Sequence, residues 1–129
     1  MKSKLIIGTL LIVLDQFLKL FAVTFFQSVF NSGIAFGIGK NVPVSATIIV
    51  FFVLSALLLR GKFSFGETLL LAGGAGNILD RLIYGKVVDW IRFGNLWFNL
   101  ADVYIGLGVL MITLVATSSK IKSQISKPS

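Results

Sequence analysis

Four long apolar stretches, separated by short polar segments, dominate the hydrophobic pattern of the chain. One of them, residues 42–59, carries no charged side chain, and the other three contain only isolated charged or amide residues; they cover residues 5–26, 63–84 and 98–117. An α-helix of about 20 apolar residues crosses the hydrocarbon core of a bilayer. The pattern therefore predicts an all-α membrane protein with four transmembrane helices.

The basic residues outside these stretches indicate how the predicted helices are oriented. Seven of them precede the first stretch, separate the second from the third or follow the fourth, and three lie in the other two connections. Because Lys and Arg are enriched in cytoplasmic segments, we expect both termini to be cytoplasmic, with a short extracytoplasmic loop platform. We interpret residues 1–129 as a single four-span domain whose polar tail, at about 118–129, is a frayed cytoplasmic end.

A cleaved signal peptide is the alternative interpretation of the first stretch. Its basic start fits that interpretation, but Asp15 interrupts the apolar run and no A-x-A-like cleavage site follows. We therefore favour an uncleaved span.

The amino-acid composition restricts the possible chemistry. The chain is 56% hydrophobic and 13% charged, more apolar than a soluble domain of this size can hide. It has no cysteine and no histidine, which excludes disulfides, thiolate nucleophiles, His-dependent triads and His-ligated zinc. Hydrolytic chemistry would have to use Lys, Ser or the five carboxylates, Asp15, Glu67, Asp80, Asp89 and Asp102. We attribute the net charge of +7 to membrane topology and predict no nucleic-acid partner.

Charged residues inside the predicted spans are candidates for function, because each is costly in a bilayer. Asp15 and Lys19 lie four positions apart, so they share a helix face and can pair. Such a pair either holds the bundle together or serves a site, and the sequence leaves both open.

The third stretch carries a stripe of polar and small residues on one helix face, Gly73, Asn77, Asp80, Arg81 and Tyr84. Its glycines allow another helix to approach closely, and Asn77 can donate or accept a hydrogen bond across that contact. We interpret Asp80 as structural, in an ion pair with Asp15 or Lys19, rather than as a reacting group.

Asp89 and Asp102 form the candidate catalytic pair. A short connection on the predicted outer side separates them, so their carboxyl groups can face each other. Two carboxyl groups close together in an apolar site cannot both ionise easily, so one keeps a proton while the other stays charged. Such a pair can hydrolyse an amide without His, Cys or metal. The alternative for Asp102 is a capping role, since Asn99 is a good N-cap for the fourth helix.

The first outer connection, residues 30–39, is unusually apolar for a loop, with two Phe, two Ile and three Gly. We expect an interfacial or substrate-facing platform there. An ordinary re-entrant turn is the alternative.

These segments together resemble the bacterial lipoprotein signal peptidases, also called signal peptidase II. The matching stretches keep the family's order from residue 15 to residue 102, and they are Asp15-Gln16-Phe17-Leu18-Lys19, Asn31-Ser32-Gly33-Ile34-Ala35-Phe36, Gly73-Gly74-Ala75-Gly76-Asn77-Ile78-Leu79-Asp80-Arg81-Leu82, Val87-Val88-Asp89 and Phe98-Asn99-Leu100-Ala101-Asp102. Each motif is weak alone, but five in order on a four-span pattern are specific.

The resemblance implies an intramembrane aspartic endopeptidase with a catalytic dyad at Asp89 and Asp102. It implies supporting or substrate-binding roles for Asp15, Lys19, Asn31, Gly33, Gly73, Asn77, Asp80, Arg81, Asn99 and Ala101. The implied substrate is a diacylglyceryl-modified prolipoprotein, cut just before its lipidated cysteine near the outer leaflet of the bacterial cytoplasmic membrane. The resemblance also implies inhibition by globomycin, contact with membrane lipid, a monomer, and neither a metal nor an organic cofactor.

The chain departs from the family pattern in its compactness. The segment between Asp89 and Asp102 is shorter than is usual in the family, which predicts a trimmed flap and leaves the efficiency of cleavage open.

Three other functions are compatible with parts of the pattern. A small proton-coupled transporter would use Asp15 but would not explain the acidic residues that gather at one surface. A Ser–Lys peptidase would need Lys19 as a base beside Ser28 or Ser32, without the usual soluble catalytic domain. A membrane scaffold would need no chemistry at all.

Overall fold

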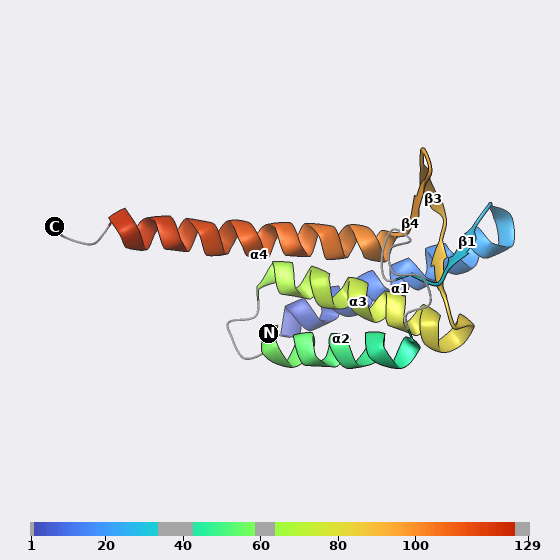
Figure 1. Cartoon of the computed structure of the whole chain (residues 1–129), viewed down its shortest axis with the longest axis horizontal. Helices are drawn as coiled ribbons and strands as arrows, with labels where there is room; N and C mark the ends of the chain where they lie inside the picture. The colour runs from blue at the N-terminus through green and yellow to red at the C-terminus, as the bar shows by residue number, and fades with distance from the viewer. Residues whose placement is uncertain (1, 34–42, 59–63, 126–129) are drawn as a thin grey trace.

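The computed structural model describes residues 2–33, 43–58 and 64–125 of the chain (Figure 1). Its helices are α1 (Lys2–Phe25), α2 (Val44–Leu58), α3 (Phe65–Tyr84) and α4 (Leu100–Ile125). Each helix corresponds to one of the four apolar stretches, and most helix ends lie within a few residues of the predicted ends. The helical part of the prediction is therefore confirmed for the described residues.

The end of α4 differs from the prediction. The helix continues to Ile125, so residues 118–125, expected to be a frayed tail, are helical. Their hydroxyl groups bond back to the helix, as Ser119 Oγ does to the Val115 carbonyl oxygen at 2.9 Å. Lys122 lies in the last turn, where the helix dipole favours a positive charge.

The all-α prediction is wrong for the connections, whose described residues include four short strands. β1 (Val29–Asn31) pairs antiparallel with β2 (Val87–Asp89), and β3 (Ile91–Phe93) pairs antiparallel with β4 (Leu96–Phe98). Gly94 adopts a positive φ of 61° in the β3–β4 turn, a conformation that glycine adopts without steric cost. Strands of three residues are too short to produce a recognisable alternation, and β1 and β2 are far apart in the chain.

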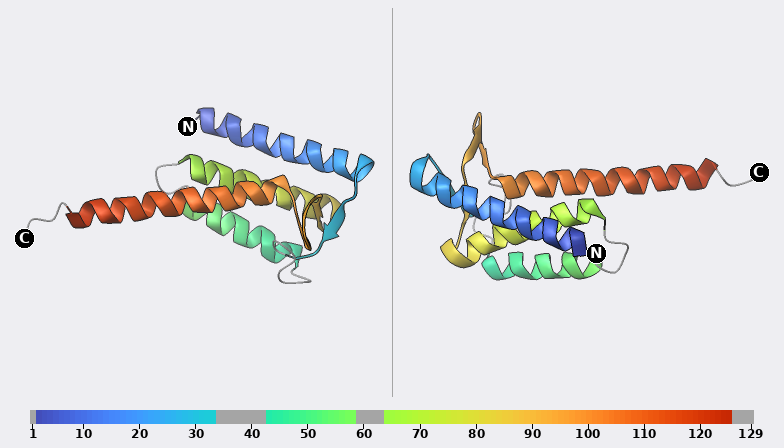
Figure 2. Two further views of the ribbon diagram at one scale, coloured as in Figure 1. Left: turned by 90° about the horizontal axis from the view of Figure 1, so that it is seen from above. Right: turned by 180° about the vertical axis from the view of Figure 1, so that it is seen from behind.

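Helix α3 is the central element of the fold, because three of its glycines each accommodate a different neighbour. A methyl group at Gly73 would overlap the Ala101 carbonyl oxygen of α4. One at Gly74 would lie 2.7 Å from the Phe51 ring of α2, and one at Gly76 would lie 2.7 Å from the Asp15 carboxylate of α1. The glycine run thus lets α1, α2 and α4 all pack closely around α3 (Figure 2).

Capping groups fix both ends of α3. Ser64 is the N-cap: its hydroxyl accepts a hydrogen bond from the Glu67 main-chain N–H, and the Glu67 carboxylate accepts one from the Ser64 main-chain N–H. At the other end, Gly85 is left-handed with a φ of 70°, and its N–H donates to the Arg81 carbonyl oxygen. The chain therefore leaves α3 directly into β2.

The interior contains many polar side chains, and large apolar side chains cover the exterior. The buried charged and amide residues come from α1, α3, β2 and the start of α4, whereas large apolar side chains of α1, α2 and α4 are widely exposed. A soluble protein does not expose so much apolar surface. Together with the apolar α1 and α4, which have the length and hydropathy of membrane spans, this arrangement is that of a membrane-integral protein.

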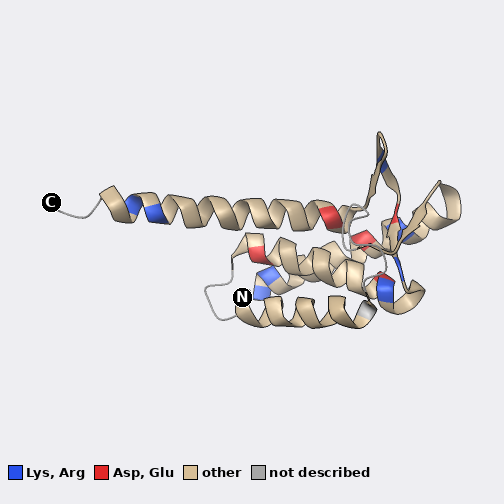
Figure 3. Ribbon diagram, in the orientation of Figure 1, with Lys and Arg blue, Asp and Glu red and all other residues tan. Residues whose placement is uncertain are grey.

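The number of membrane crossings stays a prediction. Among the described residues, α2 is shorter than a full span, and α3 carries several buried polar residues. Figure 3 shows most acidic residues near the strands, whereas the basic residues that begin α1 and end α4 lie at the opposite end of the molecule.

Candidate active site

Lys19 joins α1 to α3 through two buried ion pairs. Its Nζ lies 2.8 Å from Asp15 Oδ2, one helical turn earlier, and 2.9 Å from Asp80 Oδ2 on α3. The predicted Asp15–Lys19 pair and the structural ion pair of Asp80 are both confirmed. Because all three side chains are almost fully buried, each charge depends on the others for compensation.

The carboxylates of this cluster also hold the main chain of neighbouring elements. Asp15 Oδ1 accepts a hydrogen bond from the Ala101 N–H, in the first turn of α4, at 2.9 Å. Asp80 Oδ2 accepts one from the Val88 N–H of β2 at 2.9 Å. The ion-pair cluster therefore sets the positions of the two segments that carry Asp89 and Asp102.

Gln16 belongs to this cluster, although the sequence analysis gave it no role. Its Nε2 lies 2.9 Å from Asp80 Oδ1, 3.1 Å from the Gly76 carbonyl oxygen and 3.2 Å from Asp15 Oδ2. The sequence does contain a sign of this role, because Gln16 is an amide side chain next to Asp15 within an otherwise apolar span.

Asn77 connects the ion-pair cluster to Asp102. Its Oδ1 accepts hydrogen bonds from Lys19 Nζ at 3.1 Å and from Asn99 Nδ2 at 3.2 Å, and its Nδ2 donates to Asp102 Oδ1 at 2.8 Å. An ammonium group can only donate, so Lys19 requires the amide oxygen of Asn77 on its own side. Lys19 thereby directs the Asn77 amino group toward Asp102.

Asp89 ends β2, opposite Val29 in the β1–β2 register. Both of its carboxyl oxygens accept hydrogen bonds from amides, Oδ2 from Asn31 at 2.9 Å and Oδ1 from Asn99 at 2.8 Å. The side chain is 1% exposed. Burial is the main cause that raises the pKa of Asp89 to about 6, and the charge of Asp102 adds to it. The two amide hydrogen bonds and the charge of Lys19 offset part of this increase.

Asp102 occupies the first turn of α4 and shares Asn99 with Asp89. The Asp102 main-chain N–H donates to Asn99 Oδ1 at 3.0 Å, and the Asn99 N–H donates to Asp102 Oδ2 at 3.2 Å. This reciprocal pair is a helix cap, so the predicted N-cap role of Asn99 is confirmed and Asp102 does take part in capping. The other Asp102 carboxyl oxygen accepts a hydrogen bond from Asn77. Asn99 therefore donates to both carboxyl groups, from its side chain to Asp89 and from its main-chain N–H to Asp102.

Arg81 anchors the start of the outer connection. Its Nη2 donates to the Gly33 carbonyl oxygen at 2.7 Å, and its Nη1 donates to the Asn77 carbonyl oxygen at 3.1 Å. The Gly33 N–H in turn donates to Asn31 Oδ1 at 2.8 Å, which orients the Asn31 amino group toward Asp89. The remainder of the expected platform, residues 34–39, lies outside the described residues.

Tyr84 departs from the predicted stripe on α3. It is 43% exposed, whereas the other four stripe residues are buried. Its ring packs edge-on against Phe30 of β1, with the ring centroids 5.9 Å apart. The sequence spacing does place Tyr84 on the same helix face as the other four residues. However, Tyr84 is the last residue of α3, where this face is no longer covered by the rest of the protein.

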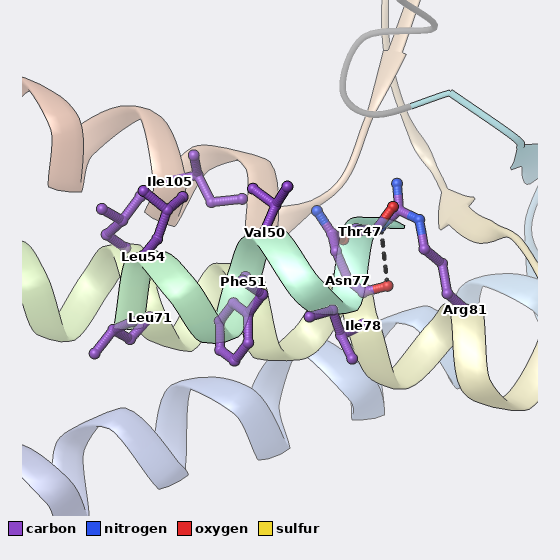
Figure 4. Close-up of a pocket in the computed structure, with 11 residues that line it drawn as sticks. Thr47, Val50, Phe51, Leu54, Leu71, Asn77, Ile78, Arg81 and Ile105 are labelled. Carbon is purple, nitrogen blue, oxygen red and sulfur yellow. Dashed lines mark hydrogen bonds between the residues drawn. The ribbon is translucent and has the colours of Figure 1, made fainter. Parts of the chain in front are cut away.

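A cavity of about 170 Å³ adjoins this site between α2, α3 and α4. Figure 4 shows Asn77 and Arg81 at one end and the apolar side chains of Leu54 and Leu71 at the other. Thr47 lies beside the polar end, and its Oγ1 is buried without a hydrogen-bond partner. The cavity thus leads from an apolar region to Asn77, which donates a hydrogen bond to Asp102.

The chain matches a known protein family. A family model described as "Signal peptidase (SPase) II" matches residues 7–118. The chain belongs to the signal peptidase II family.

Two relatives of this signal peptidase II family member illustrate the match. A "Lipoprotein signal peptidase" of Chlorobium phaeobacteroides is 32% identical, over 83% of this chain and 91% of the relative. One of Thermodesulfovibrio yellowstonii is 34% identical, over 79% of this chain and 86% of the relative. A solved structure described as "Bacterial membrane enzyme structure by the in meso method at 2.3 A resolution" shares the fold, with a TM-score of 0.84, 22% identity and coverage of 100% of this chain and 95% of that one.

The site residues suggested by the signal peptidase II resemblance are all among the described residues, and hydrogen bonds or close packing connect them. Gly73 contributes by packing only, through the contact of α3 with Ala101 and Ile105. The Ser–Lys alternative is disfavoured, because the polar contacts of Lys19 Nζ among the described residues are with two carboxylates and an amide oxygen and not with a serine hydroxyl group.

Proposed function

We propose that the chain is an aspartic endopeptidase that removes the signal peptide from diacylglyceryl-modified prolipoproteins, cutting just before the lipidated cysteine. One observation carries the proposal: Asp89 and Asp102 are both buried, and Asn99 donates to both carboxyl groups, from its side chain to Asp89 and from its main-chain N–H to Asp102. The chain has neither His nor Cys to supply another general base or nucleophile. Membership of the signal peptidase II family supports the substrate class.

In the proposed mechanism, the two carboxyl groups share one proton. The ionised carboxylate takes a proton from a water molecule, which attacks the scissile carbonyl carbon. The protonated carboxyl group donates its proton to the carbonyl oxygen. As the C–N bond breaks, this group takes its proton back from the tetrahedral intermediate, and the other carboxyl group passes the proton that it took from water to the leaving amine. The raised pKa of Asp89, about 6, supports a dyad that holds one proton to a higher pH than an ordinary aspartate would, and the dyad titrates as a pair.

Amide groups orient the dyad in this proposal. Asn31 and Asn99 each donate to Asp89, and Asn77 donates to Asp102. These donors hold both carboxyl groups in a fixed geometry before substrate binds, which avoids reorganisation during the reaction. Lys19 acts through Asn77, as a positioning residue rather than a catalytic one.

We further propose that all four helices cross the bacterial cytoplasmic membrane, with both termini in the cytoplasm and the dyad near the outer leaflet. The basic residues at the start of α1 and near the end of α4 support this orientation. The cavity beside Asn77 and Arg81 would receive apolar residues of the signal peptide, and the unpaired Thr47 hydroxyl would bond to its main chain. We expect globomycin to compete for this site, and we expect the enzyme to act as a monomer.

A gel-shift assay with purified enzyme tests the proposed function. A diacylglyceryl-modified prolipoprotein is the substrate, and mass spectrometry of the product identifies the cut bond. The unmodified proprotein is the matched control for the lipid requirement. We expect cleavage of the lipidated form immediately before the modified cysteine. A well-folded enzyme that leaves this substrate intact, or cuts elsewhere, would contradict the proposal.

A further inference from the structure

A second and larger cavity, of about 510 Å³, lies between α1, α2 and α3. It exists because α1 and α2 pack chiefly against α3 rather than against each other. Small side chains widen it, with Gly8 on α1 and Ala72 and Ala75 on α3. We call it the α1–α2 groove.

The walls of the α1–α2 groove are suited to a hydrocarbon chain. Its hydroxyl groups are already bonded to the main chain of their own helices: Thr9 to the Leu5 carbonyl oxygen at 2.9 Å, Ser55 to that of Phe51 at 2.7 Å and Thr68 to that of Ser64 at 3.1 Å. None of these hydroxyls therefore offers its hydrogen to an occupant. The remaining lining is apolar apart from one lysine.

That lysine gives one end of the groove a positive charge. Lys4 lines the groove and is half-buried, and Lys2 begins α1 two residues earlier. Lys4 precedes Asp15 by eleven positions of one helix, which places it about 16 Å along the axis from the ion-pair cluster.

We propose that the α1–α2 groove binds an anionic phospholipid, with an acyl chain along α3 and the headgroup at Lys4. Basic pockets between helices at the cytoplasmic surface bind acidic lipid headgroups. The signal peptide of a substrate is a poor occupant, because its n-region is positively charged like this end of the groove. Placement in the cytoplasmic leaflet rests on the orientation given under the proposed function.

Bound lipid would fill the space between α1 and α2 and hold both against α3. Asp15 and Lys19 lie on the same helix as Gly8, and Asn77 and Asp80 lie on the same helix as Ala72. The lipid would therefore stabilise the pair of helices that carries the ion-pair cluster. The binding itself requires no peptidase activity.

Native mass spectrometry of the full chain in detergent tests the proposal, with an equimolar mixture of phosphatidylglycerol and phosphatidylcholine that have the same acyl chains. We expect the wild type to retain one lipid and to prefer phosphatidylglycerol. Lys4→Gln is expected to lower that preference about fivefold, the effect of one basic residue at an anionic surface. Lys120→Gln, on exposed α4, is the matched control and keeps the preference.

A second variant tests the acyl-chain site without changing charge. Gly8→Leu places a side chain in the groove, where the nearest atom to a new Cβ is Thr68 Cγ2 at 3.5 Å, so the helix itself tolerates it. We expect Gly8→Leu to lose both lipids, whereas Gly106→Leu, which meets nothing within 4 Å, retains them. Equal retention of the two lipids by the wild type, or full retention by folded Gly8→Leu, would overturn the proposal. Either result would leave the peptidase assay unaffected.

Discussion

The contact of Gly73 with α4 provides a sensitive test of how the fold positions Asp102. In Gly73→Ala, the new methyl group would overlap the Ala101 carbonyl oxygen and lie 2.8 Å from Ile105 Cγ1. The Ile105 side chain can rotate away, but the main-chain oxygen of Ala101 cannot. The first turn of α4, which carries Asp102, must therefore move.

The size of this movement and its cost follow from the contact. Non-bonded heavy atoms pack best at about 3.5–4.0 Å, so α4 has to shift by about 1 Å. Overpacking of this kind lowers the free energy of unfolding by about 1–3 kcal/mol. Replacing a helical Gly by Ala raises it by about 1 kcal/mol, because Ala has the higher helix propensity. The net loss of stability is thus small, about 0–2 kcal/mol. A 1 Å displacement of a catalytic group, by contrast, lowers the rate about 100-fold.

The prediction is measured by kcat in the gel-shift assay and by thermal unfolding of the same preparations. Gly106→Ala is the matched control, because nothing lies within 4 Å of its new Cβ. We expect the control to keep wild-type kcat and to unfold at a slightly higher temperature. Wild-type kcat in folded Gly73→Ala would refute the argument that this close contact positions Asp102.

Two further predictions concern the buried charges. Lys19→Met removes the cation shared by Asp15 and Asp80, so the unfolding free energy should fall by about 3–5 kcal/mol in denaturant titrations; an unchanged value would show that the ion pairs do not stabilise the fold. Because the folded pKa of Asp89 is raised from 3.8 to about 6, its contribution to stability is present below about pH 4 and is lost as the pH rises through about 6. Stability should therefore decrease by about 3 kcal/mol more over this range in the wild type than in Asp89→Asn, and equal pH dependence of the two would contradict the shift.

Local patterns in the sequence were sufficient to predict the helices and the first ion pair. Apolar runs of membrane length marked each helix, and the spacing of Asp15 and Lys19 is a property of one helix. The cap formed by Asn99 and Asp102 is also local, because its two residues lie three positions apart.

The contacts that organise the site could not be read from the sequence, because they join distant segments. The β1–β2 pairing brings Asn31 beside Asp89 across 58 positions, and neither three-residue strand has a pattern of its own. The three neighbours of the α3 glycines depend on the packing angles of whole helices. Gln16 was visible as a polar residue in a span, but its partners on α3 became apparent only in the folded chain.

The requirement for both aspartates is tested by comparing cleavage of a diacylglyceryl-modified prolipoprotein by the wild type, Asp89→Asn and Asp102→Asn, after each is shown to be folded. Glu67→Gln is the matched carboxylate control, because Gln can retain the cap of α3 and Glu67 lies at the opposite end of that helix from Asp80. We expect cleavage by the wild type and Glu67→Gln, and none by either aspartate variant. Cleavage at the wild-type rate by folded Asp89→Asn or Asp102→Asn would contradict the two-aspartate mechanism.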